Sequence, residues 1–292
     1  MESKRYPTDP SDDGWRCIRS HLPGPTGQGR PRFHGLRAIL DAVFYVLGSG
    51  CPWRLLPKDF PPCKTVYGRF GRWRIDGTRK RLNTGLRGLL RVRLGRDPDP
   101  QRRHRGLPVG KATGVGGTEC GFDPAKKAEG RKRHLLVVDT EGLVLGARVH
   151  SAKEPDQDGI RLLLDPARDR LGRLLHLWVD AGYQGRARRW AEEVSGSSVE
   201  IVRRPRKPLP EEVAKVWAEA WAKEGGEEVD WQGLMPPRGF RVLARRWVVE
   251  RTYAWICHDR RMARDYERLC ATGKAFVYAA MTRLMVRRLA RA

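Results

Sequence analysis

The apolar residues of this chain change their spacing near residue 96, and this change limits the folds that the chain can adopt. Before that point they recur at helical intervals, and the run LRAILDAVFYVLGSG places one stripe on a helix face: Leu36, Ile39, Leu40, Val43, Phe44 and Leu47. After it, the runs RKRHLLVVD, GLVLGARVHS and LLHLWVD have the length and apolar content of strands. The sequence therefore predicts helices first and a sheet afterwards.

Glycine and proline become frequent between Gly95 and Gly121, so we predict a domain boundary near residue 96. Residues 1–95 are expected to form a helical domain, and residues 96–292 an α/β domain with a sheet of mixed direction. Within the second domain, DTEG turns a hairpin, DQDGIRLLLDPARDRL and GRARRWAEEV are helical, and SVEIVRR is a strand. Residues 205–239 are expected to be a helical insertion outside the sheet. Two long helices, the first covering RRWVVERTYAWICHDRRMARDYERL, are expected to end the chain.

The chain carries a large excess of positive charge. It has 58 Lys plus Arg against 34 Asp plus Glu, which gives a formal net charge of +24. Self-repulsion of this size is usually offset by a polyanionic partner, because phosphate contacts release counterions. The alternative is a ribosomal-type or merely alkaline protein.

Aromatic and basic residues alternate in one stretch of the helical part, at Tyr67, Arg69, Phe70, Arg72, Trp73 and Arg74. A helix that buries its aromatic residues and exposes its arginines could lie on DNA in the manner of a helix-turn-helix unit. A solvated basic face over an ordinary core is the alternative for each arginine.

No run approaches the ~18 apolar residues that a membrane span needs, and MESKRYPTDP lacks an apolar signal stretch, so a cytoplasmic protein without membrane contact is expected. The six cysteines form no CxxC pair. Reduced thiols are therefore expected rather than a structural zinc site.

Two carboxylates stand in positions that suit metal-dependent chemistry. Asp180 closes the apolar run LLHLWVD, and Glu250 lies within RRWVVERTYAW. Strand ends and helix faces hold side chains rigidly, and converging carboxylates can bind the cations that phosphodiester cleavage needs. Taken singly, Asp180 could be a turn residue, and Glu250 could pair with Arg246 or Arg251.

Longer strings around these acids resemble a known family. They are GCPWRLLPKDFPPCKTVYGRFGRW, GRKRHLLVVDTEGLVLGARVHSA, LWVDAGYQG and RRWVVERTYAWICHDRRMARDYE. On these strings the chain resembles the bacterial insertion-sequence transposases of the DDE class, in particular the insertion sequence five family. The resemblance covers nearly the whole chain and implies a ribonuclease H-like catalytic domain behind a helical DNA-binding domain.

The family's catalytic acids are an Asp on the first strand, an Asp after the fourth and a Glu on a late helix. The resemblance implies that Asp180 is the second and Glu250 the third, both acting as catalytic residues and as ligands of Mg²⁺ or Mn²⁺, with two ions in the intact family. Arg246 matches the arginine of the family's tyrosine, arginine, glutamate and lysine signature and would contact phosphate. Leu243 and Cys257 replace the tyrosine and the lysine.

The first acid is missing. The family's first strand typically reads like SAAIVDSQSVK, whereas this chain reads QRRHRGLPVGK. Read one base later, the codons of Gln101 to Gly110 permit all ten expected residues, with the Asp spanning the codons of Gly106 and Leu107. We infer a double frameshift, in the gene or in its sequencing. As written, this segment is expected to be an edge strand or a loop, because Pro108 cannot donate to a ladder.

Other acids are weaker substitutes for the missing one. Asp139 lies at the hairpin turn. Asp156 and Asp158 are expected to cap the helix that follows them. Glu119 and Asp123 lie in a glycine-rich stretch. Strand transfer by the chain as written is therefore predicted to be negligible.

The sequence thus predicts a transposase that binds the terminal inverted repeats of its element and the target DNA as a homodimer. It would catalyse metal-dependent cleavage and strand transfer, impaired in this copy. A catalytically inactive DNA-binding remnant is the alternative, and a general nuclease is a third. Trp247 and Trp255 are expected in the core rather than stacked on bases. The expected phosphate contacts are Arg69, Arg72, Arg74, Arg131, Lys132, Arg133, Arg246 and Arg251.

Overall fold

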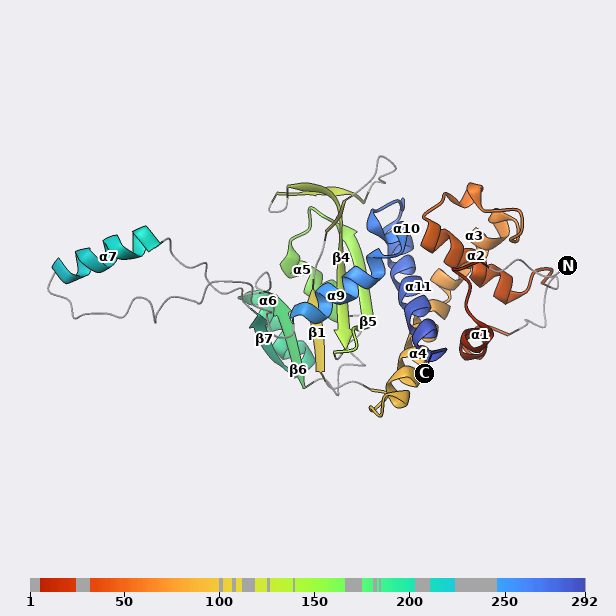
Figure 1. The fold of residues 1–292 in the computed structure, drawn as a ribbon, viewed down its shortest axis with the longest axis horizontal. Coiled ribbons are helices and arrows are strands. Elements are labelled where there is room, and N and C mark those ends of the chain that lie inside the picture. Colours follow the sequence, from red (N-terminus) through yellow and green to blue (C-terminus); the bar gives the residue numbers. More distant parts are fainter. Residues whose placement is uncertain are drawn as a thin grey trace.

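The computed structural model describes most of the chain, in twelve segments. They are residues 6–24, 32–99, 102–106, 109–111, 119–124, 127–138, 140–165, 175–180, 183, 185–202, 211–223 and 246–291. Helices dominate its first part and a mixed sheet its second (Figure 1).

The first part contains the helices α1 (Asp12–Arg19), α2 (Leu36–Ser49), α3 (Cys63–Ile75) and α4 (Thr78–Arg93), with a 3₁₀ turn at Trp53–Leu55. The Ser11 hydroxyl caps α1 by accepting a hydrogen bond from the Gly14 amide at 3.2 Å. Helix α2 ends at Gly50, whose φ of 75° is left-handed. The predicted α2 stripe is buried except for Leu36, which is partly exposed.

The last helix, α11 (Cys270–Leu289), packs against all four of these helices and also against the sheet. One hydrophobic core runs from Ile18 and Phe44 through Phe276 to Leu136 and Val179. Helix α11 thus lies between the first helices and the sheet (Figure 1). The helical part of the molecule is therefore built from both ends of the chain, α1 to α4 and α11. The domain boundary near residue 96 stays a prediction.

The sheet is built on the predicted hairpin, which is confirmed as β4 (Ala128–Val138) paired antiparallel with β5 (Leu143–Ser151). Strand β1 (Arg102–Gly106) pairs antiparallel with β4 and parallel with β6 (His176–Asp180), which pairs parallel with β7 (Ser198–Val202). The short strands β2 (Val109–Lys111) and β3 (Gly121–Asp123) pair with the first half of β4.

The position of β1 corrects one expectation. Residues 101–110 were expected at an edge or in a loop, but β1 lies between β4 and β6, inside the sheet. Strand β1 ends at Gly106, two residues before Pro108 in the sequence. The N–H group that proline lacks therefore costs this strand no ladder hydrogen bond.

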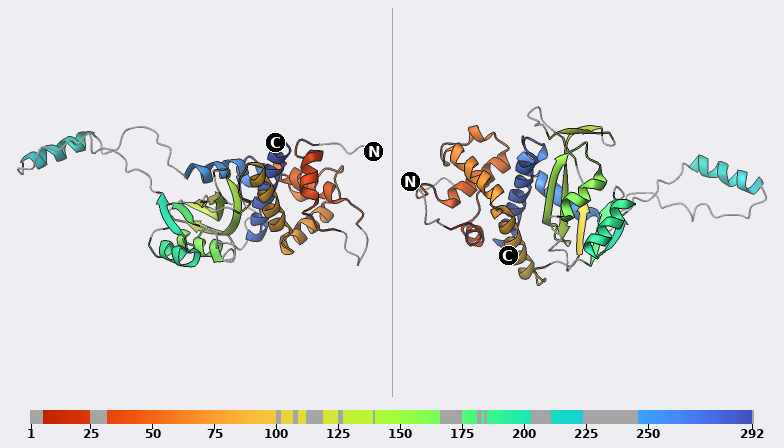
Figure 2. Two further views of the ribbon diagram at one scale, coloured as in Figure 1. Left: turned by 90° about the horizontal axis from the view of Figure 1, so that it is seen from below. Right: turned by 180° about the vertical axis from the view of Figure 1, so that it is seen from behind.

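Helices cover both faces of the sheet, as the alternation of side chains along β4 shows. Lys132 and His134 point toward α5 (Asp156–Leu164), whereas Arg131 and Arg133 bond to the segment between α9 (Arg246–Cys257) and α11. Helix α6 (Arg186–Ser195) packs beside α5 and β7, on the side of the sheet away from α9 (Figure 2).

Two helices differ from the expected pattern. The long helix expected from residue 245 to 269 breaks after α9, where Asp259 has extended backbone (ψ 117°) before the short helix α10 (Arg260–Ala263). The insertion contains the expected helix, α7 (Glu211–Lys223), which lies apart from the sheet (Figure 1). No helix among the described residues is long and apolar enough to cross a bilayer.

Candidate active site at the ends of β1 and β6

Strands β1 and β6 end side by side. Their parallel register pairs His104 with Trp178, and each strand continues for two more residues, to Gly106 and to Asp180. Asp180 is also paired with Val202 of β7. Asp180 therefore lies at the carboxyl edge of the sheet, level with Gly106. The side chains of both residues lie outside the described part of the structure.

Helix α9, which carries Glu250, packs against β1, β4 and β6. Val248, Val249 and Tyr253 are buried against the sheet, whereas the side chain of Glu250 is exposed. Among the described residues, no three His, Cys, Asp or Glu side chains form a group that could hold a metal ion. The backbone thus places Asp180 and Glu250 on adjoining elements, and β1 adds no carboxylate because it reads RRHRG.

Arg251, next to Glu250, is held by several contacts. It donates a hydrogen bond to the carbonyl oxygen of Thr140, and its Cζ lies 4.5 Å and 4.3 Å from the ring centres of Trp247 and Trp255. Both indoles are partly exposed, so the expectation that they belong to the core is met only in part, with Trp247 packed against the core. Arg246 is the first residue of α9, and its side chain lies outside the described part.

The three basic residues of β4, which were expected to contact phosphates, bind groups of the protein itself. Arg131, Lys132 and Arg133 are 0%, 4% and 5% exposed. Arg131 pairs with Asp265 at 3.0 Å, and Lys132 pairs with Asp156 at 2.7 Å. Arg133 donates to the carbonyl oxygens of Met262 and Arg264 at 2.7 and 3.0 Å. Because these side chains are buried and already bonded, we assign them a structural role instead of DNA contact.

The arginines of α3 keep the expected arrangement in part. Phe70 and Trp73 are buried while Arg72 is exposed, but Tyr67 is 52% exposed. Arg69 is half-buried, and this burial lowers its pKa. Arg74 is also half-buried and donates a hydrogen bond to Thr272 Oγ1 of α11 at 3.2 Å. Arg72 is therefore the most accessible of the three predicted DNA contacts on this helix.

The weaker candidate acids are engaged elsewhere. Glu119 accepts a hydrogen bond from the Cys270 amide, which lowers the pKa of Glu119. Asp123 lies 3.3 Å from the Nζ of Lys132. Asp156 and Asp158 lie in the first turn of α5 but do not cap it, because residue 155, a proline, is the N-cap. Asp139 lies outside the described residues.

A chain of hydrogen bonds that the sequence did not predict leads away from the segment after Asp180. The Tyr183 hydroxyl lies 3.2 Å from His134 Nδ1, and His134 Nε2 lies 2.5 Å from His150 Nε2. His150 Nδ1 lies 2.8 Å from the Ser151 carbonyl oxygen, which can only accept. The bonds are mutually consistent if Tyr183 donates to His134, His134 to His150, and His150 to Ser151.

This chain of hydrogen bonds crosses the sheet, from the segment after β6 to the outer strand β5. Its two imidazoles are stacked, with ring centres 4.6 Å apart, and burial lowers the pKa of His150. The sequence signal was the presence of one histidine in each apolar strand of the hairpin. The two rings come together only through the strand register. It places Lys132 opposite His150 and His134 opposite Arg148, so the two histidines are diagonal neighbours on one face of the hairpin.

Comparison with known proteins yields two family matches. Residues 11–83 match the family described as "Putative transposase of IS4/5 family", and residues 101–285 match "Transposase DDE domain". A protein of Sinorhizobium fredii (strain NBRC 101917 / NGR234), described as uncharacterized protein y4sN, is 40% identical over 63 residues. That match covers 21% of this chain and 50% of the relative, so the chain spans about half of that protein's length. No solved structure matches the chain.

Proposed function

The chain belongs to the DDE transposases of the IS4/5 type, and we propose that it binds the terminal inverted repeats of its own insertion sequence. The whole element would be moved through cleavage and strand transfer into target DNA. The transposase family acts on DNA and generally uses divalent metal ions. The net charge of +24 suits a polyanionic partner of this kind.

One observation carries the proposal. Strand β6 ends at Asp180 beside the end of β1, and α9 packs across both strands with Glu250 on it. In the chain order β1, β4, β5, β6 and β7, Asp180 closes the fourth main strand and Glu250 lies on a late helix. We therefore assign the family's first, fourth and late positions to β1, β6 and α9, three elements that contact one another. This supports a ribonuclease H-like fold for the domain after residue 96.

The metal site is incomplete in this copy. Asp180 and Glu250 would supply carboxylate oxygens to Mg²⁺ or Mn²⁺, which in the family activates the attacking oxygen and neutralises the leaving one. The third donor would come from the end of β1, where this chain has Gly106 after three arginines and a histidine. Two carboxylates without a third fit a divalent ion poorly, so we assign no catalytic step to this copy.

The composition of β1 favours a second candidate function, a catalytically inactive DNA-binding remnant. Such a chain would still recognise the element ends and would interfere with active copies by occupying them. DNA contacts in either case are proposed for Arg69, Arg72 and Arg74 of the helical domain and for Arg246 and Arg251 of α9. We expect a homodimer to bring two ends together.

Incubation of the purified protein with labelled element ends tests both functions. Retarded migration of the ends without nicking, in Mg²⁺ or in Mn²⁺, is the result expected of the remnant, and cleavage at the end of the repeat is expected of an active transposase. Cleavage that ignores the terminal sequence would identify a general nuclease. A failure to bind any DNA would overturn the proposal.

A further inference from the structure

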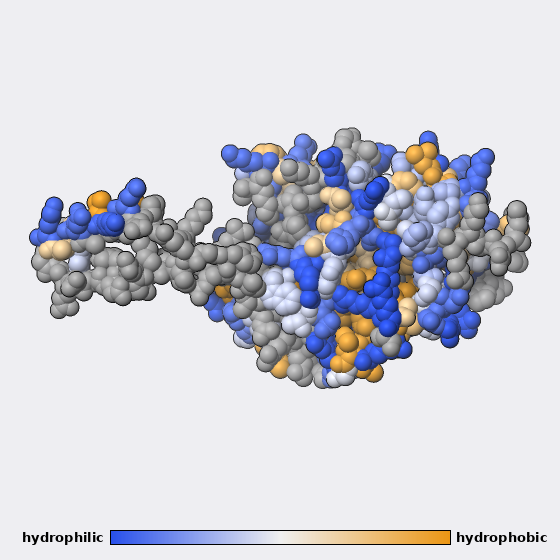
Figure 3. Space-filling view, in the orientation of Figure 1, coloured by the Kyte–Doolittle hydropathy of each residue, from blue (hydrophilic) through white to orange (hydrophobic). Residues whose placement is uncertain are grey.

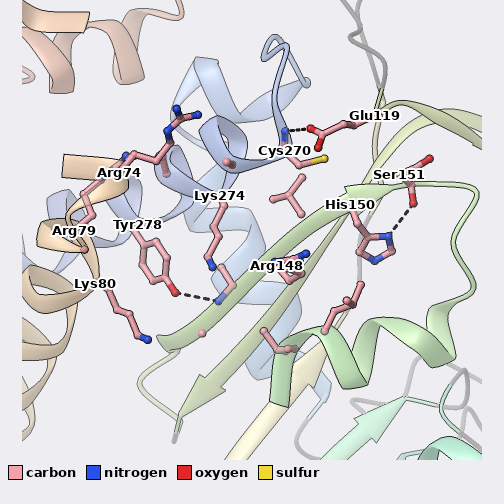
Figure 4. A pocket seen from close by; sticks show the side chains of 18 of the residues that line it. Arg74, Arg79, Lys80, Glu119, Arg148, His150, Ser151, Cys270, Lys274 and Tyr278 are labelled. Carbon is pink, nitrogen blue, oxygen red and sulfur yellow. Dashed lines mark hydrogen bonds between the residues drawn. The ribbon is translucent and has the colours of Figure 1, made fainter. Parts of the chain in front are cut away.

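A groove lies where α3, α4 and α11 meet the outer strand β5 of the sheet. It has a volume of about 660 Å³ and is lined by α3, α4, α5, β5, α11 and the segment before β3. Cations from four different elements line it: Arg74 from α3, Lys80 from α4, Arg148 from β5 and Lys274 from α11 (Figure 4). The opposite face of the molecule, which carries α9, has its own strip of hydrophilic residues (Figure 3).

The positive charge of the groove is weakly compensated. Among the residues that the structure describes, Arg74, Arg79 and Arg148 form no ion pair with a carboxylate. Arg79 is buried and stacks on Phe70, and this burial, reinforced by Arg74, lowers its pKa to about 9. An excess of cations over anions raises the affinity of a concave surface for anions.

The acids that line the groove are fewer than its cations: they are Glu119 and Glu154, against Arg74, Arg79, Lys80, Arg148 and Lys274. Glu119 is bound to the Cys270 amide. Glu154 also lines the groove, and its backbone carbonyl oxygen accepts a hydrogen bond from Lys132. The groove therefore presents more positive than negative side chains to solvent.

The groove lies at the same end of the sheet as Asp180. Strand β4 is antiparallel to both β1 and β5, so β5 runs parallel to β1 and β6. Leu135 of β4 pairs with Gly106 on one edge and with Ala147 on the other. Ala147 lines the groove and is thus level with the end of β1. Three strand spacings, about 14 Å, separate β5 from β6.

We propose that this groove binds the phosphate backbone of duplex DNA through Lys80, Arg148 and Lys274, and guides it from the helical domain to the edge that carries Asp180. The inference rests on the proposed function, because it names the surface that holds the same DNA. A duplex is favoured over a small anion because the cations lie on both walls of an open groove instead of converging on one point (Figure 4). A phosphate backbone offers anions along both walls.

The test measures binding of a fluorescently labelled duplex by anisotropy at several salt concentrations. The variants are Lys80→Gln, Arg148→Gln, Lys274→Gln and the triple combination. Each lost phosphate contact should reduce the slope of log affinity against log salt by about 0.9 and weaken binding roughly fivefold at about 0.15 M salt. The triple variant should lose about three times as much of the slope as a single variant does.

Arg189→Gln is the matched control. Arg189 is an exposed arginine on α6, next to β7 at the opposite edge of the sheet, and its loss should leave the slope nearly unchanged. Thermal unfolding followed by circular dichroism verifies that each variant is folded. Lys80 is exposed, so the Lys80→Gln variant keeps the test valid if substitutions at the other two sites disturb the fold.

Three results would overturn the proposal. If the wild-type chain binds duplex DNA and the triple variant binds with the same slope, the groove is not the DNA surface, while the proposed function stands. If the triple variant loses only the binding of inorganic phosphate, the groove is a small-anion site. If the wild-type chain binds no duplex at all, the proposed function fails together with the groove.

Discussion

The guanidinium Nη1 of Arg131 lies 3.0 Å from Asp265 Oδ2, and the two side chains are 0% and 2% exposed. Arg131 belongs to β4, and Asp265 lies in the segment between α10 and α11. Arg131 also donates to the carbonyl oxygens of Glu267 and Arg268. This buried pair therefore holds the sheet to the segment that leads into α11, the helix that packs against the first four helices.

Removing the acid of this pair should destabilise the protein strongly. Asp265→Ala leaves the Arg131 cation buried with only backbone acceptors, and we expect the free energy of unfolding in urea to fall by about 3–5 kcal/mol. Glu192→Gln is the control, because it removes an exposed pair between Arg188 and Glu192 on α6, at 2.9 Å. Its cost should stay below about 0.5 kcal/mol. Equal costs for the two variants would show that Arg131 does not depend on Asp265.

The stability of the protein should depend on His150 at mildly acidic pH. Burial lowers the pKa of His150, and the hydrogen bond to the Ser151 carbonyl oxygen opposes this effect. Lys132 and Arg148 lower the pKa further, Glu154 raises it, and His134 is bonded to the ring. Below about pH 6.5 the unfolded chain then binds a proton that the folded chain resists, so stability should fall as pH drops below that value.

His150→Gln should flatten this dependence, as measured by urea unfolding between about pH 5 and pH 7. The variant is expected to be less stable at every pH, since it loses bonds to His134 and Ser151. His258→Gln, at an exposed histidine, should keep the wild-type dependence. An undiminished pH slope in His150→Gln would contradict the assignment.

Gly159 of α5 should not tolerate a side chain. A Cβ atom built there would lie 1.9 Å from His134 Cε1, so Gly159→Ala must displace an imidazole that is bonded to Tyr183 and His150. We expect a loss of about 1–3 kcal/mol in the free energy of unfolding. Gly68→Ala, in α3 with nothing within 4 Å of its Cβ, should instead stabilise by about 0.5–1 kcal/mol. A stabilising Gly159→Ala would mean that His134 moves without cost.

Restoring the first strand should restore catalysis. The segment 101–110 would be replaced by SAAIVDSQSV, which includes Gly106→Asp at the end of β1, level with Asp180. A third carboxylate at this edge should complete the metal site. We expect the rate of Mg²⁺-dependent strand transfer of labelled element ends to increase by more than about 100-fold over the chain as written. Mutation of residues that only hydrogen-bond to metal ligands already costs about 10 to 100-fold in activity.

The matched control carries the same replaced segment with Gly106→Asn. It should bind the element ends as the repaired chain does and remain inactive, because an amide cannot supply the negative charge. Similar activity of the two repaired chains, or of the chain as written, would refute the role assigned to the end of β1. Sequencing of the corresponding codons tests the frameshift itself: codons that cannot give GAC across positions 106 and 107 would exclude it.

The sequence alone determined the types of the local elements and the family. The α2 stripe, the hairpin at DTEG and the strand that ends at Asp180 were predictable because helix and strand periodicities are properties of neighbouring residues. The order of the family strings also predicted where the first acid should lie, and the segment QRRHRGLPVGK at that place contains no Asp or Glu. The same local signals could not tell that the helix beginning at Arg246 breaks at Asp259.

Only the tertiary structure decided which side chains are covered. Alternation along RKRH places Arg131 and Arg133 on one face and Lys132 and His134 on the other, but it does not reveal that the segment before α11 buries the first pair. Likewise, β1 became an inner strand through pairing with β4 and β6, which are distant in the chain. Pairing and burial depend on residues far apart in sequence, so local periodicity leaves them open.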